Sequence, residues 1–278
     1  MIIKNLMNKK IRLYWWHENR ENGLENYGDL LSKYLVEAIS GKKVISIKHP
    51  LKGIHKYFFK NYVCIGSIIS SASKQSIVWG SGIIKKNDNI REATFAAVRG
   101  PKTRSRILEL GYDCPEVYGD PAILLPNYYN PKVEKKYKIG IIPHYVDYKQ
   151  VKKAIANDNN IKIIDLLTND VIKTTQEILE CEQIISSSLH GVILPQAYRI
   201  PSLWVKFSNK LSGDNIKFYD YFESMSINFT NEMFVEPSTL TFEFLDKLLI
   251  DNKDTLLQED AILNKRKAEL LASCPFFS

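Results

Sequence analysis

The chain has 278 residues, 45% of them hydrophobic and 25% charged, which is ample for one or two domains with a large buried core. No apolar run approaches the roughly 18 residues of a membrane span, and residues 1–10 are too short and too polar for a signal peptide, so we expect a cytoplasmic protein. The formal net charge of +7 permits an anionic substrate, an acidic membrane surface or nucleic acid, and does not choose among them.

Strand-like and helix-like segments alternate in the first half of the chain, which predicts an α/β architecture with mostly parallel sheets. Gly41 should end the first helix as a C-cap, and Pro101 suits the first turn of the second. Residues 26–29 are predicted to form a loop before the first helix. The expected strands are 11–16, 44–47, 62–65, 77–79 and 95–98, and the expected helices are 30–39 and 102–110.

A segment rich in Pro, Asn and Tyr at residues 126–131 is the predicted domain boundary, which gives domains of residues 1–131 and 132–278. The same alternation then resumes, so each half should be doubly wound. The last helix could brace the two halves, or it could be a surface or partner helix. The expected strands are 138–142, 161–166, 183–186 and 202–207, and the expected helices are 171–180, 191–198, 242–250 and 259–271.

The most informative stretch begins at Ile184, where an apolar strand runs into three serines and then His190-Gly191 at the start of a helix. Small hydroxyl residues at the end of a strand let the backbone approach a ligand closely. The free N–H groups of the following helix then point at negative charge. We therefore expect a polyanion site here, with His190 able to give or take a proton near neutral pH. The alternative is a structural histidine that caps the helix.

Other polar side chains follow predicted strands, at the edge where open α/β sheets bind ligands. His144 comes directly after the strand 138–142, although it could also be a surface histidine. Asp29 and Asp120 each lie in a Gly-Asp turn and could act as bases. Asp29 could equally cap a helix, and for Asp120 we expect an Asx turn before Pro121.

Four short motifs occur in a consistent order from Asn26 to Gly191. Because of these motifs, the chain resembles the polysaccharide pyruvyl transferase family. They are Asn26-Tyr27-Gly28-Asp29; Val78-Trp79-Gly80-Ser81-Gly82; Val98-Arg99-Gly100-Pro101 with Gly119-Asp120-Pro121-Ala122; and Ser187-Ser188-Leu189-His190-Gly191.

This resemblance implies two Rossmann-like domains that face a cleft, as in GT-B glycosyltransferases, with the acceptor on the side of residues 1–131 and the donor on that of 132–278. It implies phosphoenolpyruvate as co-substrate, with no other cofactor. Two hydroxyls of a saccharide, either free or lipid-linked, would receive the pyruvyl group as a cyclic ketal, with release of phosphate. Such products belong to exopolysaccharide, capsule or lipopolysaccharide synthesis, and a peripheral contact with the inner membrane surface would suit them.

The chemistry needs a cationic pocket for the donor, an acid for the enol carbon and a base for the attacking hydroxyl. The flat apolar rings that follow the first strand suit a sugar face, although they could equally lie in the core. The predicted catalytic residues are His190, Asp29 and His144. The predicted donor-binding residues are Ser187, Ser188, Leu189, Gly191, Lys206 and Arg99, and the predicted acceptor-binding residues are Asn26, Trp16, His17, Ser67 and Ser81.

One departure from the family pattern concerns Ser188. Many relatives have arginine immediately before Leu-His-Gly, and a serine cannot clamp a carboxylate through two parallel hydrogen bonds. Three explanations fit this departure. The chain could belong to a branch of the family that has serine here, the cation that binds the donor could come from another part of the chain, or the donor could be a different molecule. Lys206 and Arg99 are the candidates for the missing charge.

Two other function classes fit the same sequence. A glycosyltransferase that uses a nucleotide sugar could have the same scaffold, and a non-catalytic sugar- or membrane-binding module could use the positive charge. No nucleic-acid-binding motif accompanies that charge. The four cysteines lie far apart without a Cys-x-x-Cys pair, so we expect reduced thiols, no zinc site and no metal requirement.

Overall fold

The computed structural model describes residues 10–277 except 19, 53–57, 156–157 and 230–231. The expectation about a signal peptide in residues 1–10 therefore falls almost wholly outside the described residues. Within the described ranges, no helix has the length and apolar character that a bilayer crossing needs.

The N-terminal half is built on a five-stranded sheet in which every neighbouring pair is parallel, in the order β3-β1-β4-β5-β6. All five strands were predicted from the apolar runs, each within a few residues of its ends. The strands are β1 (Ile11–Tyr14), β3 (Val44–Ser46), β4 (Asn61–Val63), β5 (Ser76–Trp79) and β6 (Thr94–Ala97), and the helices are α1 (Tyr27–Ser40), α3 (Pro101–Glu109) and the 3-10 helices η1 (Ile69–Ser71) and η2 (Pro121–Asn127).

Helix α1 begins earlier than predicted, because the motif at residues 26–29 is a cap and first turn rather than a loop. The side chain of Asn26 accepts a hydrogen bond from the N–H of Gly28 and so satisfies one of the free donors of the first turn. At the other end Gly41 adopts the left-handed conformation with φ of 63°, which confirms its predicted role as the C-cap. Asp29 is consequently part of the first helical turn.

The C-terminal half contains a four-stranded parallel sheet in the order β11-β10-β7-β8. Both halves are therefore mixed α/β with parallel sheets, as predicted. Helices α4 and α7 were not predicted. The strands are β7 (Tyr137–Ile142), β8 (Ile161–Ile163), β10 (Cys181–Ser186) and β11 (Ser202–Trp204), and the helices are α4 (Tyr148–Ala154), α5 (Val171–Leu179), α6 (His190–Ala197), α7 (Ile216–Ser224), α8 (Phe242–Asp251), α9 (Asp260–Ala272), η3 (Pro237–Thr239) and η4 (Lys253–Thr255).

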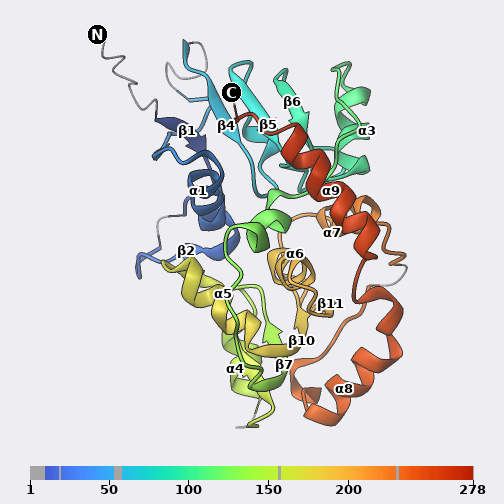
Figure 1. Ribbon diagram of the computed structural model, residues 1–278. Helices are drawn as coiled ribbons and strands as arrows, with labels where there is room; N and C mark the ends of the chain where they lie inside the picture. Colours follow the sequence, from blue (N-terminus) through green and yellow to red (C-terminus); the bar gives the residue numbers. More distant parts are fainter. Residues whose placement is uncertain (1–9, 19, 53–57, 156–157, 230–231, 278) are drawn as a thin grey trace.

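Three connections join the halves. β2 (Glu25–Asn26) pairs antiparallel with β9 (Leu167–Thr168), and η2 packs against both α1 and α6. Helix α9 leaves the C-terminal half and returns to the N-terminal one (Figure 1). There the carbonyl of Leu270 accepts a hydrogen bond of 3.1 Å from the indole Nε1 of Trp79. The C-terminal helix therefore braces the two halves, which the sequence had left open.

The four cysteines are free, and Cys64, Cys114 and Cys181 are buried as expected, whereas Cys274 is partly exposed. Apolar side chains from both halves contribute to one continuous core, so the segments that carry the motifs meet in a well-packed interior.

Candidate active site

A cavity of about 450 Å³ lies between the halves, at the carboxyl ends of both parallel sheets. Trp16 follows β1, Ser67 follows β4, His144 follows β7 and Ser188 follows β10. Strand ends of this kind are where open α/β sheets bind ligands. The cavity is lined by Trp16, Glu18, Arg20, Asn26, Asp29, Gly66, Ser67, Ile68, Ser70, Ser71, Ile84, His144, Tyr145, Ser188, Leu189, His190, Ser212 and Lys217.

His190 lies directly against the first turn of α1. A Cβ atom placed on Gly28 would come within 2.0 Å of the ring Nδ1, so only glycine leaves room for the imidazole. Asp29, the next residue, also lines the cavity. Two motifs that are far apart in the sequence thus form one surface, and the glycine of the first motif is required by the histidine of the last.

Asp120 approaches His190 from the opposite side. Its Oδ1 accepts a hydrogen bond of 3.0 Å from the N–H of Ala122, which is the predicted Asx turn and also caps η2. Its Oδ2 lies 3.6 Å from Nε2 of His190. The expected structural role of Asp120 is therefore confirmed for one carboxylate oxygen, and the other oxygen faces the imidazole.

Burial shifts the pKa values of Asp29 and His144, the two other residues that were predicted to be catalytic. It raises the pKa of the Asp29 carboxyl to about 7, although His190 and Arg20 act to lower it. It lowers the pKa of His144 to about 4, and the positive charges of Lys217 and Arg20 act in the same direction. Near pH 7 the site therefore holds a carboxyl group that can give or take a proton, together with a neutral His144.

Two cations that the sequence had not indicated line the cavity. Lys217 extends from α7, and burial together with the charge of Arg99 lowers the pKa of its ammonium to about 8, against the opposing effect of Asp29. It remains largely charged at pH 7, and it makes no ion pair or hydrogen bond to another described residue. Arg20 is paired with Glu18, and its guanidinium lies 4.8 Å from the centre of the Tyr145 ring.

Only part of the serine cluster reaches the cavity. The hydroxyl of Ser186 donates to the carbonyl of Ile142 at 2.8 Å, and Ser187 Oγ accepts from the backbone N–H of His144 at the same distance. These bonds link β10 to β7, and the bond to Ser187 holds the backbone of His144 in place. Ser188 and Leu189 line the cavity, whereas a Cβ at Gly191 would come within 2.2 Å of Ser186 Oγ, so that glycine serves packing.

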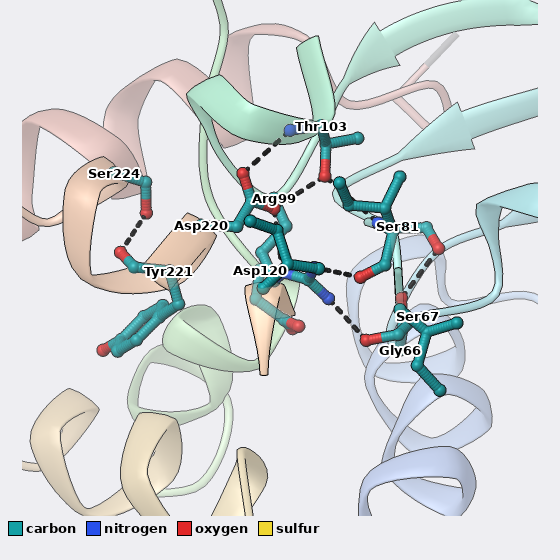
Figure 2. Close-up of polar contacts among 12 residues, drawn as sticks. Gly66, Ser67, Ser81, Arg99, Thr103, Asp120, Asp220, Tyr221 and Ser224 are labelled. Carbon is teal, nitrogen blue, oxygen red and sulfur yellow. Dashed lines mark hydrogen bonds and ion pairs between the residues drawn. The ribbon is translucent and has the colours of Figure 1, made fainter. Parts of the chain in front are cut away.

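Arg99 was predicted to bind the donor, but it is fully buried and is not among the residues that line the cavity. Figure 2 shows Arg99 among Ser67, Thr103 and Asp220. Its Nε lies 3.1 Å from Oδ2 of Asp220, Nη1 donates to Ser67 Oγ at 2.6 Å, and Nη2 donates to the carbonyl of Ile83 at 2.6 Å. Asp220 also accepts bonds from the N–H and the hydroxyl of Thr103. Arg99 therefore links α7 to the loop that holds Ser67.

Of the other predicted residues, some line the cavity and some lie outside it. Asn26, Trp16 and Ser67 line the cavity, and Trp16 is 49% exposed. Ser81 is buried, and its hydroxyl donates to the carbonyl of Gly66. His17 lies outside the cavity wall between Glu25 and Ser46, and Lys206, also outside it, pairs with Glu232 at 3.2 Å.

Lys217 is the functional candidate that sequence reasoning missed, because α7 itself was not recognised. The signal was present, since Phe218, Tyr221 and Phe222 are buried at helical spacing and mark an amphipathic helix. Its position at the cavity depends on the packing of α7 against α3, which local pattern does not reveal.

Comparison with known proteins identifies relatives over most of the chain. The family model described as "Polysaccharide pyruvyl transferase" matches residues 26–209. "Uncharacterized protein L143" of Acanthamoeba polyphaga mimivirus is 30% identical over 254 residues, which cover 89% of this chain and 86% of the relative. "Succinoglycan biosynthesis protein ExoV" of Rhizobium meliloti (strain 1021) is 25% identical over 229 residues, 78% of this chain and 65% of that protein.

Proposed function

The chain belongs to the polysaccharide pyruvyl transferase family, and we propose that it transfers the pyruvyl group of phosphoenolpyruvate to two hydroxyls of a saccharide. The product is a cyclic pyruvate ketal in the synthesis of a surface polysaccharide. A relative named for succinoglycan biosynthesis supports the polysaccharide acceptor. The observation that carries the proposal is that Asp29, His144 and His190 meet Lys217 and Arg20 around one cavity.

The donor requires positive charge at both of its ends, because phosphoenolpyruvate carries a carboxylate and a phosphate. Ser188 supplies none, and Lys217 takes the place of the arginine that many family members have there. Arg20 provides a second cation in the cavity lining. The N–H groups of His190 and Gly191 at the start of α6 add hydrogen-bond donors for an oxyanion, whereas those of Val192 and Ile193 are already bonded to the carbonyl of Leu189.

The proton chemistry follows from the state of each group near pH 7. Asp29, with its pKa of about 7, gives a proton to the methylene carbon of the enol while the first saccharide hydroxyl attacks the adjacent carbon. His190 takes the proton of that hydroxyl, and a positioned acid or base of this kind typically contributes ~10²–10⁴ in rate. The second hydroxyl then attacks the same carbon as the bond to phosphate breaks. Of the two hydroxyl protons, one restores Asp29 and the other leaves with phosphate.

The acceptor enters over Trp16, whose exposed ring offers a flat apolar face to a sugar, with Asn26 and Ser67 as hydrogen-bonding neighbours. Two parallel sheets with a cavity at their carboxyl ends support a GT-B-like arrangement of donor and acceptor halves. A cytoplasmic location with peripheral contact to the membrane, where a lipid-linked acceptor would lie, completes the proposal.

Thermal unfolding with phosphoenolpyruvate, and in parallel with a panel of nucleotide sugars, tests the donor without knowledge of the acceptor. A ligand at ~100 times its Kd adds about 2.7 kcal/mol to stability, a shift of several degrees. We expect phosphoenolpyruvate to raise the Tm of the unchanged protein and of Lys206→Met, a matched lysine outside the cavity, but not of Lys217→Met. Stabilisation by a nucleotide sugar alone would instead identify a glycosyltransferase.

A further inference from the structure

Two buried polar atoms in the site lack a hydrogen-bond partner among the described residues, and they face each other. They are Oδ2 of Asp120 and Nε2 of His190, 3.6 Å apart. A buried polar atom without a hydrogen-bond partner destabilises the folded state. A shift of a few tenths of an ångström turns this contact into a hydrogen bond from Nε2–H to the carboxylate, which satisfies both atoms at once.

The carboxylate of Asp120 is held in place from several directions. It is fully buried, and its other oxygen is fixed by the N–H of Ala122. Its backbone is fixed as well, because the following Pro121 packs so closely on Gly80 that a Cβ there would lie 2.2 Å from the proline Cδ. Oδ2 is therefore aimed at the imidazole by the packing of the Gly-Asp-Pro-Ala segment, independently of any ligand.

A carboxylate in this position decides where a neutral imidazole carries its single proton. The group bonded to one ring nitrogen sets the tautomer, and an acceptor at Nε2 places the proton there. Nδ1 then keeps its lone pair. That nitrogen lies against Gly28, and His190 lines the cavity.

We propose that Asp120 is a positioning residue that holds His190 in the Nε2–H tautomer, so that Nδ1 is the nitrogen that takes the proton of the saccharide hydroxyl. The role assigned to Nδ1 rests on the proposed function, whereas the tautomer is a property of the free protein. The side chain of Asp120 thus has two tasks: one oxygen caps η2, and the other orients the base.

Asp120→Asn tests this pairing with little change of shape. The amide oxygen still accepts from Ala122, but an NH₂ group now faces Nε2, which must become an acceptor, and the ring proton moves to Nδ1. Nitrogen-15 NMR of histidine-labelled protein distinguishes the tautomers at a pH where the ring is neutral, with the His190 signals assigned from their absence in His190→Gln. We expect Nε2–H in the unchanged protein and Nδ1–H in Asp120→Asn.

Kinetics provide the second measurement. We expect Asp120→Asn to lower kcat by about 10²–10⁴, as for a base held in the wrong tautomer, with the KM for phosphoenolpyruvate changed less than about threefold because the donor cations are untouched. Asp170→Asn is the matched control, since Asp170 caps α5 through the N–H of Lys173 and lies outside the cavity wall. It should change neither the tautomer nor kcat.

Several results would overturn the inference. An Nδ1–H tautomer in the unchanged protein refutes it, and this measurement decides the matter even if Asp120→Asn fails to fold. An unchanged tautomer and kcat in folded Asp120→Asn refute it too. If no turnover with phosphoenolpyruvate is found while the tautomers behave as expected, the proposed function fails and the pairing of Asp120 with His190 stands.

Discussion

Asp220→Asn should destabilise the protein by about 3–5 kcal/mol, because it leaves the buried charge of Arg99 without its counterion. Both side chains are fully buried, with Nε and Oδ2 3.1 Å apart. At an effective dielectric constant of ~20, two unit charges at this separation interact by about 5 kcal/mol, which agrees with that range. The asparagine keeps an acceptor for the N–H of Thr103, so the loss falls on the ion pair and on the hydrogen bond that the Thr103 hydroxyl donates to the same Oδ2.

A matched control exists on the same helix, α7. Lys102 on α3 pairs with Glu223 on α7 at 2.8 Å, but both side chains are more than one-third exposed, so Lys102→Met should cost less than about 1 kcal/mol. The two changes therefore separate the effect of burial from the mere presence of an ion pair on α7.

The assay is denaturant unfolding of Asp220→Asn, Arg99→Met and the double variant. In the double variant the buried charge is gone. The loss of unfolding free energy in the double variant should therefore be smaller than the sum of the two single losses by more than about 1 kcal/mol. Additive losses, or a loss for Asp220→Asn no larger than for Lys102→Met, would refute the view that this pair fixes α7. Because Lys217 lies one turn before Asp220 on α7, a weaker response of Tm to phosphoenolpyruvate should accompany the instability.

Two further predictions concern the first turn of α1. Burial raises the pKa of Asp29 to about 7, so between about pH 4 and 7 the native state binds a proton that the unfolded chain has lost, and the contribution of Asp29 to stability falls as pH rises through this interval. His144, with its pKa lowered to about 4, contributes a slope of the opposite sign over much of the same interval. Asp29→Asn should therefore make the slope of unfolding free energy against pH more positive there, and an unchanged slope would contradict the raised pKa. Gly28→Ala should displace His190 and lower kcat more than tenfold, since the added Cβ meets Nδ1 at 2.0 Å. Wild-type turnover in this variant would show that the close contact is not needed.

Local chemistry explains why the elements could be predicted. The apolar runs that form β4, β5 and β10 are strands in the structure because their alternation with helices requires parallel, buried sheets. Gly41 and Pro101 mark helix ends because their backbone preferences act without reference to the rest of the chain. The start of α1 was misjudged, since the cap that Asn26 makes moves the helix start to Tyr27.

The candidate site could be predicted only in part, for a physical reason. Asp29, His144 and His190 follow strands or open helices, and the topology of parallel sheets brings such positions to a common edge. Which cation faces the ligand is a different matter. Arg99 and Lys217 are both basic residues near helix starts. Nothing in the sequence shows that Arg99 binds only to other buried groups of the protein, whereas Lys217 faces the cavity.

The sequence by itself determined the class of fold, the positions of the strands, the motifs that indicate the family and the residues able to move protons. Only the tertiary structure decided that Arg99 is buried and does not line the cavity, that Lys217 lines it and that Asp120 faces His190. The first set depends on forces between residues near one another in the chain, such as capping and periodic burial. The second depends on side chains that are distant in sequence and share one close-packed interior, where each buried charge must find its partner.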